Sequence, residues 1–390
     1  MPEVTTEKKP ISTFRIAVMG FLSLALAMGI GRFVFTPLLP LMQADGLISV
    51  SEGGLIAGPH FLGYWLGAVL AARLPFAPKA VLQISLVVIA LSTLAMGLTE
   101  NFSSWIVLRF LAGLLSAFTL VMISGYYVNT LAEAGETSKQ GWVFAGVGGG
   151  IAFSGIGTLA IMIIGLDSKI SWQIFGIAAL VLGIFLILFM GPEIPRKRVR
   201  RSVRAGKPTP LNWRNIIAYG ATGLGYIIPA TYLPVMAKEI INDPLVFGWS
   251  WPIFGAAACL STLIAARLQG RFSNLSIWRV CQIIMAAGLC LPVLFPTITA
   301  ILLAGICVGG TFMIITMMGI KEAHRTAPPV DALRHIAAMT SAFAAGQMLG
   351  PFVASAVLGS TGDFSYVLLG TGALLIFTVA GLKEKGSKKE

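Results

Sequence analysis

Arg32 and Arg109 each interrupt a long apolar segment of the kind that could cross a membrane. Placing an arginine in hydrocarbon costs roughly 2.5–3.5 kcal/mol on insertion scales, so we expect both to face a protein interior or a wet cavity. None of the 16 Asp and Glu residues falls in the middle of an apolar segment. Two buried cations without an embedded carboxylate indicate an anion from elsewhere, and a guanidinium can hold a carboxylate by two parallel hydrogen bonds. We therefore predict a bound small organic anion.

A structural role is the alternative for both arginines. Either guanidinium could extend toward the membrane surface, bond backbone carbonyls freed near Pro37, or pair with Glu52 or Glu100 at the outer ends of their segments. The helical rise puts both arginines about 8–14 Å from the membrane midplane, in the same half of the bilayer. Because they lie on two different segments at similar depth, a shared pocket is the favoured interpretation.

His60 lies near the middle of another apolar segment. Histidine titrates near neutral pH, and no buried Asp or Glu is available to carry a proton instead. We therefore consider His60 as a residue that can bind and release a proton, and also as a substrate-binding residue. A histidine that only bonds a neighbouring helix is the alternative.

The elements that hold these residues are membrane-spanning helices. The chain has 390 residues, of which 56% are hydrophobic and 11% charged, and its apolar segments repeat at membrane-spanning length. A β-barrel would instead show short segments that alternate in polarity. We predict twelve spans, at residues 14–40, 51–73, 79–98, 102–131, 138–166, 171–190, 212–237, 244–268, 276–295, 297–321, 334–360 and 363–382.

The positive charges indicate the orientation. When loops are assigned alternately to the two sides, the side that holds both termini carries every Lys and Arg except Lys169, Lys238, Arg32 and Arg109. By the positive-inside rule both termini are cytoplasmic, and we expect an integral protein of a bacterial inner membrane. The net charge of +12 is then explained by topology and lipid contact rather than by nucleic acid.

A basic stretch at 192–211 divides the chain into an N-terminal bundle, 1–191, and a C-terminal bundle, 212–390, of six spans each. The two halves repeat. A shift of 194 residues lays Gly29, Gly31, Pro40 and Met42 on identical residue types, and it also lays LAARL at 70–74 on IAARL at 264–268. Both halves begin on the same side, so we predict an all-α protein whose two six-helix bundles are related by a parallel pseudo-twofold axis.

Several polar side chains sit within the predicted spans. Tyr226 occupies the repeat position of Arg32, and we expect it on the opposite wall of a central cavity. Tyr126 and Gln347 are further candidates for substrate binding. For all three, hydrogen bonding between helices is the alternative.

Six plus six spans joined by a basic loop resemble the major facilitator superfamily over essentially the whole chain. The stretch GIGRFVFTPLLPLM at 29–42 and GQMLGP at 346–351 look like its YbfB/YjiJ branch. The resemblance implies that spans one, four, seven and ten line the cavity, and it also implies that the arginine of the Arg109-x-x-x-Gly113 motif takes part in proton coupling or in binding substrate charge. Both buried arginines fall on such spans.

Two family motifs are altered. Ala71 stands at the position of the family's aspartate in the loop after span two, although Gly67 and Arg73 remain. The charged contact through which this loop usually controls the conformational change is therefore in doubt. The glycine-rich run at 146–150 has no proline of the antiporter type, which weakens an efflux assignment.

Glycines and prolines in the spans indicate close helix contacts and weakened helices. We assign gating or helix packing to Gly29, Gly31, Pro37, Pro40, Gly113, Gly146, Gly150, Gly346, Gly350 and Pro351.

We find no phosphate loop, metal spacing or Ser/His/Asp arrangement, so we expect neither enzyme activity nor a cofactor. The predicted function is secondary active transport by alternating access. The expected partners are an anionic small molecule, a coupling proton and membrane lipid, with no nucleic acid, and we expect a monomer. The alternative is a proton-linked efflux antiporter for amphipathic or drug-like compounds.

Overall fold

The computed structural model describes residues 12–71, 77–191, 209–241, 243, 246, 248–268, 271–361 and 363–382. Most of the predicted basic loop, together with Arg73, lies outside these residues. The described helices are α1 (Thr13–Leu24), the π-helix η1 (Ala25–Ile30), α2 (Phe35–Ala44), α3 (Val50–Ala71), α4 (Pro78–Met96), α5 (Phe102–Ile123), the π-helix η2 (Ser124–Val128), α6 (Asn129–Glu133), the 3-10 helix η3 (Thr137–Lys139), α7 (Gln140–Ile164), α8 (Ser168–Phe189), α9 (Trp213–Ile240), α11 (Ser250–Leu268), α12 (Asn274–Leu294), α13 (Ile298–Thr326), α14 (Pro329–Thr361) and α15 (Ser365–Val379).

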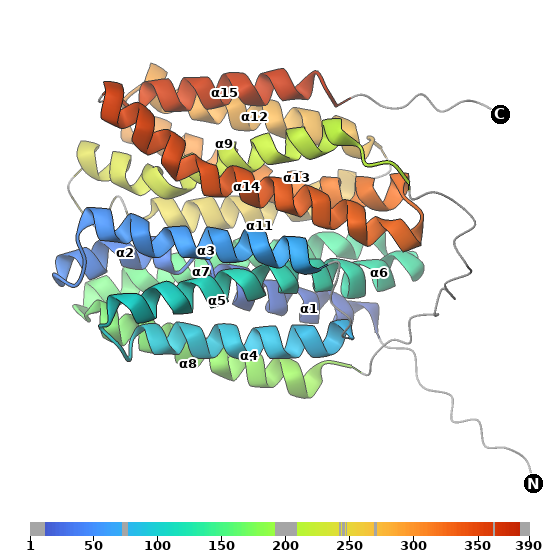
Figure 1. The fold of residues 1–390 in the computed structure, drawn as a ribbon, viewed down its shortest axis with the longest axis horizontal. Helices are drawn as coiled ribbons and strands as arrows, with labels where there is room; N and C mark the ends of the chain where they lie inside the picture. The colour runs from blue at the N-terminus through green and yellow to red at the C-terminus, as the bar shows by residue number, and fades with distance from the viewer. Residues whose placement is uncertain are drawn as a thin grey trace, which may run out of the picture.

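These helices make twelve passes in the described part of the chain, and each predicted span overlaps one of them. The prediction of an all-helical membrane fold is confirmed. Nine passes are both long and apolar enough to cross a membrane, and α9, α11 and the shorter α15 complete the set. The helices lie side by side as one bundle, with the start of α1 and the end of α15 at the same end (Figure 1).

Each half packs its helices in the same order. In the first half α3 contacts α5, α1 contacts α7, and α4 contacts both α5 and α8. In the second half α11 contacts α13, α9 contacts α14, and α12 contacts both α13 and α15. Every contact of the first list therefore has a counterpart six passes later. The symmetry axis itself stays a prediction.

The two halves meet along two seams, where α7 lies against α11 and α3 lies against α14. The first seam depends on small residues. A Cβ on Gly148 would lie 2.6 Å from the carbonyl carbon of Ala258, and a Cβ on Gly255 would meet the backbone of Ala152. Because neither glycine carries a side chain, the two backbones approach as closely as helices do in a small-residue contact.

The helices farthest from the seams are α4 and α8 on one side and α12 and α15 on the other (Figure 1). Their outward faces are apolar. On α8 the exposed residues include Ile177, Val181 and Leu188, and on α15 the side chain of Phe377 is 78% exposed. Such faces suit contact with lipid acyl chains, and they leave the inner passes to build a polar site.

Candidate functional site

The first pass is broken near its centre. The amide of Gly31 bonds the carbonyl of Leu26, and the amide of Phe33 bonds that of Met28, each five residues back. Further on, Pro37 has no N–H to offer the carbonyl of Phe33, and the amide of Thr36 bonds that carbonyl at 3.2 Å. Thr36 therefore does not bond Arg32, the residue four positions back, as it would in a regular helix. The carbonyl of Arg32 is left available to a different donor.

Arg109 of α5 supplies that donor. Its Nη2 donates to the carbonyl of Arg32 at 3.3 Å, and its Nη1 donates to the carbonyl of Gly31 at 3.2 Å. The guanidinium carbon also lies 4.7 Å from the centre of the Phe35 ring. Arg109 thus ties the fourth pass to the break in the first. This is close to the structural alternative in which an arginine bonds carbonyls freed near Pro37.

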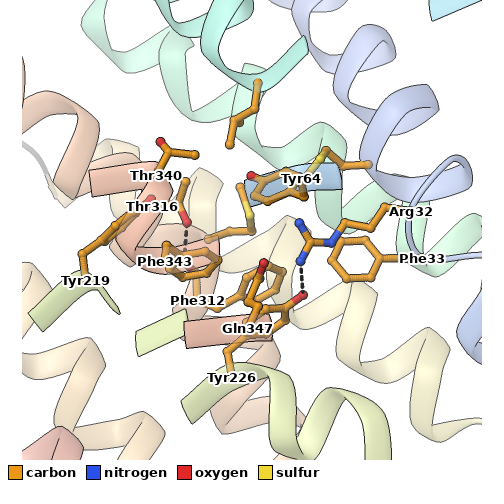
Figure 2. Close-up of a pocket in the computed structure, with 13 residues that line it drawn as sticks. Arg32, Phe33, Tyr64, Tyr219, Tyr226, Phe312, Thr316, Thr340, Phe343 and Gln347 are labelled. Carbon is orange, nitrogen blue, oxygen red and sulfur yellow. Dashed lines mark hydrogen bonds between the residues drawn. The ribbon is translucent and has the colours of Figure 1, made fainter. Parts of the chain in front are cut away.

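The side chain of Arg32 extends from the break toward the second half (Figure 2). Its Nη2 donates to the hydroxyl of Tyr226 at 3.3 Å, across the boundary between the halves. The guanidinium carbon lies 4.4 Å from the centre of the Tyr64 ring and 5.0 Å from that of Phe33. Its Nε has no hydrogen-bond partner among the described residues. The cation is 3% exposed, so it is held largely by rings and one hydroxyl.

Arg32 and Tyr226 line a cavity between the halves (Figure 2). The cavity is narrow, with room for little more than a water molecule. Of the described residues that line it, Arg32 is the one that carries a charge, and none is acidic. The lining residues are Met28, Arg32, Phe33, Tyr64, Leu120, Tyr219, Tyr226, Phe312, Met313, Thr316, Thr340, Phe343 and Gln347.

Two acidic residues near the same end of the bundle, Glu100 and Glu52, are engaged elsewhere. Glu100 forms an ion pair with Lys169 at 2.8 Å, and the Glu52 carboxylate accepts hydrogen bonds from the amide and hydroxyl of Ser49. The described residues record no ion pair between either carboxylate and a buried arginine. Neither of these two carboxylates therefore cancels the positive charge of Arg32.

Three of the six predicted substrate-binding residues, Arg32, Tyr226 and Gln347, come together at the cavity. Gln347 is 1% exposed, and neither its amide oxygen nor its amide nitrogen has a hydrogen-bond partner among the described residues. A buried amide without a partner is unusual in a protein interior.

The other three, Arg109, His60 and Tyr126, lie outside the cavity lining. His60 is fully buried in α3, its ring nitrogens have no hydrogen-bond partner among the described residues, and its ring contacts Phe61 edge to face at 5.9 Å. Tyr126 lies in η2 with its ring 4.9 Å from that of Tyr127. Of the two arginines predicted to share one pocket, Arg32 therefore lines the cavity, whereas Arg109 lies outside the lining and bonds the backbone of Arg32.

The predicted packing glycines of the first half lie where helices touch. A Cβ on Gly146 would meet the carbonyl of Phe21, and one on Gly150 would lie 2.6 Å from the Cα of Gly29. A Cβ on Gly31 would meet the side chain of Ile89 on α4, and one on Gly113 would lie 2.8 Å from the carbonyl carbon of His60. These glycines let α7 approach the first pass and α5 approach α3.

The second half repeats this arrangement. A Cβ on Gly346 would lie 2.8 Å from the amide of Leu224, and one on Gly350 would meet the side chain of Ile227, so α14 lies close to α9. Pro351 falls inside α14, as Pro40 falls inside α2.

Several lining residues escaped the sequence analysis. Three of them are separated by helical spacings from a residue that was identified: Thr340 and Phe343 precede Gln347 by seven and four positions, and Tyr219 precedes Tyr226 by seven. Positions three, four and seven apart share one face of a helix. A search at these helical spacings, starting from one identified polar residue, could therefore have found these three residues.

Two six-helix halves with the same order of packing, enclosing a site where they meet, define a membrane transporter of the major facilitator type. The family model described as "Uncharacterised MFS-type transporter YbfB" matches residues 24–382, and the chain belongs to this family.

Two further comparisons agree with this assignment. The chain is 25% identical over 197 residues to the "Uncharacterized MFS-type transporter YceJ" of Bacillus subtilis (strain 168). That alignment covers 49% of this chain and 48% of the relative, so the chain spans about half the length of the curated relative it matches. The fold is similar to the crystal structure of the human organic anion transporter MFSD10 (TETRAN), with a TM-score of 0.74 at 12% identity, over 96% of this chain and 100% of that one.

Proposed function

We propose that the protein is a secondary active transporter that carries a small organic anion across the membrane by alternating access. The observation that supports this is Arg32, a buried cation in a cavity whose described lining contains no acid. A buried charge is stabilised when an opposite charge reaches it, and a carboxylate bonds a guanidinium through two short, charge-assisted hydrogen bonds. The similarity in fold to a protein described as an organic anion transporter is consistent with this class of substrate.

In the proposed cycle Arg32 binds the substrate anion at the boundary between the halves. Its bond to Tyr226 is long, at 3.3 Å, so an anionic oxygen competes well for the same N–H. The substrate then contacts both halves at once, and rocking of one half against the other exposes it to alternate sides. The narrow cavity requires the halves to separate before an organic molecule enters.

We also propose the orientation predicted from the charges, with both termini cytoplasmic in a bacterial inner membrane. The start of α1 and the end of α15 lie at the same end of the bundle, which is consistent with an even number of passes (Figure 1). The bundles at 1–191 and 212–390 then act as the two moving parts, and the basic stretch at 192–211 lies beside anionic headgroups.

The test is substrate uptake or release in proteoliposomes that contain Arg32→Ala, Arg32→Lys or the unchanged protein. Arg32→Ala is expected to abolish transport of carboxylates while the protein inserts normally. Arg32→Lys keeps the charge without the planar fork and is expected to retain a small part of the activity. Full carboxylate transport by Arg32→Ala would rule out the proposed role of Arg32.

A second candidate, proton-linked transport, is favoured by one observation. His60 is buried without a hydrogen-bond partner among the described residues, on the pass that also carries Tyr64. We propose that His60 and Arg109 couple transport to a proton, in either import of the anion or efflux of amphipathic compounds. His60→Gln is expected to leave substrate binding intact and to remove the response of transport to a pH gradient. An unchanged response would exclude the histidine.

A further inference from the structure

The wall that faces Arg32 is an aromatic stack. The ring of Tyr226 lies between those of Phe312 and Phe343, with centroids 4.7 Å and 5.7 Å away and planes tilted by only 10° and 15°. The three residues come from α9, α13 and α14 (Figure 2). Both faces of Tyr226 are thus covered, and Phe254 stacks on the other face of Phe312 with centroids 5.5 Å apart, so the wall offers ring edges to the cavity. Edge-to-face contact is also an arrangement that aromatic groups prefer, so a further ring can pack against these edges.

The cation itself is flanked by rings. Tyr64 and Phe33 lie within 5.0 Å of the guanidinium carbon of Arg32. A guanidinium is planar, binds ring faces through its own faces and donates hydrogen bonds from its edge. The edge of Arg32 therefore bonds oxygen atoms, and the rings around the guanidinium make its surroundings apolar. An anionic group attached directly to an aromatic ring satisfies both.

The amide of Gln347 provides a third contact. It lines the same cavity next to Tyr226 (Figure 2), it is buried, and neither of its polar atoms has a partner among the described residues. A buried amide that stays unbonded is unfavourable, so a ligand with a donor or acceptor at this place gains affinity that a plain hydrocarbon ring does not.

We propose that the substrate is an aromatic carboxylate with a polar ring substituent such as a hydroxyl. Its carboxylate binds Arg32, its ring packs beside the Tyr226 and Phe312 rings, and its substituent bonds the amide of Gln347. This inference rests on the proposed function, because it assumes that the anion binds at Arg32.

The experiment is calorimetric titration of the purified full chain with matched acids. Benzoate and cyclohexanecarboxylate have similar size and charge, but only benzoate has a ring face. The three monohydroxybenzoates test the substituent. We expect benzoate to bind about three- to tenfold more tightly than cyclohexanecarboxylate. We expect at least one hydroxybenzoate to bind about tenfold more tightly than benzoate.

Variants assign each preference to a side chain. Phe312→Leu keeps an apolar side chain and is expected to remove the preference for benzoate, whereas Phe377→Leu on the exposed face of α15 is the matched control. Gln347→Met keeps the length of the side chain and is expected to remove only the preference for the hydroxyl. If Phe312→Leu does not fold, Phe343→Leu and the acid series on the unchanged protein still decide the question.

The outcomes separate the two proposals. Equal binding of benzoate and cyclohexanecarboxylate, abolished by Arg32→Ala, would overturn the aromatic substrate and keep the anion transporter. Equal binding of benzoate and all hydroxybenzoates would overturn the role of Gln347. No binding of any carboxylate would overturn the proposed function itself.

Discussion

The two halves of the molecule share an order of packing but build their cavity-lining passes differently. In the first half the first and fourth passes contain the π-helical segments η1 and η2, and they carry Arg32 and Arg109. In the second half the corresponding helices, α9 and α13, run for 28 and 29 residues as regular α-helices and contribute Tyr219, Tyr226 and Phe312. One half is interrupted and cationic, and the other is continuous and aromatic.

The difference teaches how a cation can be kept in a membrane protein without an acid. An interrupted helix leaves carbonyl dipoles free, and Arg109 uses two of them. Carbonyls are neutral, so they stabilise the cation without cancelling its charge, and the positive field at Arg32 persists. A continuous helix has no carbonyls to spare and presents side chains on a regular face instead. In the proposed mechanism, charge is therefore recognised by the first half and shape by the second.

The largest effect that would test this comparison is on stability. Arg109→Leu leaves two buried carbonyls without their donor, and we expect the free energy of unfolding to fall by about 2–5 kcal/mol. The matched variant is Arg32→Leu, which loses one long bond to Tyr226 and also a buried charge, so we expect a change within about 1 kcal/mol. Unfolding in mixed micelles measures both. If Arg32→Leu is the more destabilised variant, the roles assigned to the two arginines are reversed.

A smaller effect is expected at the seam between the halves. In Gly148→Ala the new methyl group would lie 2.6 Å from the carbonyl carbon of Ala258, so α7 and α11 must move apart, at about 1–3 kcal/mol for overpacking. Because the seam joins the moving parts, we also expect slower transport.

The control for the seam is Gly183→Ala on α8, inside the first half. There the added methyl group would meet Leu26 at an ordinary 3.6 Å, and replacement of a helical glycine stabilises by about 0.5–1 kcal/mol. Transport rates and unfolding curves of the two variants distinguish them. Equal behaviour would show that the seam tolerates separation.

The sequence predicted the passes and one pair across the cavity. The length of the apolar segments was sufficient to predict the twelve passes, because the thickness of a bilayer sets the length of a membrane-spanning helix. The internal repeat paired Arg32 with Tyr226, and the two side chains lie 3.3 Å apart. Their role in binding substrate stays a prediction.

The sequence indicated bonding to carbonyls freed near Pro37 as an alternative for either arginine, but residue types could not decide that Arg109 makes these bonds. The position of Arg109 depends on Thr36 turning its amide to Phe33, which decides which carbonyl remains free, and that choice is made by backbone geometry around Pro37. The aromatic wall was missed for a different reason. Phe312 lines the cavity and Phe377 is exposed on the outer face, although both sit in apolar helices. Side chains that face lipid and side chains that face a protein core are similarly hydrophobic, so hydrophobicity does not distinguish the two faces of a helix.

The smallest effect concerns the contact that joins the halves. Tyr226→Phe removes the hydroxyl and keeps the ring between Phe312 and Phe343, so we expect stability to change by no more than about 0.5–1.5 kcal/mol, the worth of one hydrogen bond. Without its hydroxyl partner Arg32 is more available, and carboxylate binding should be unchanged or slightly tighter. Tyr226→Leu also removes the ring and should weaken the binding of aromatic acids alone. If Tyr226→Phe instead abolishes carboxylate binding, the hydroxyl itself contacts the substrate, and recognition of charge is shared by both halves rather than confined to the first.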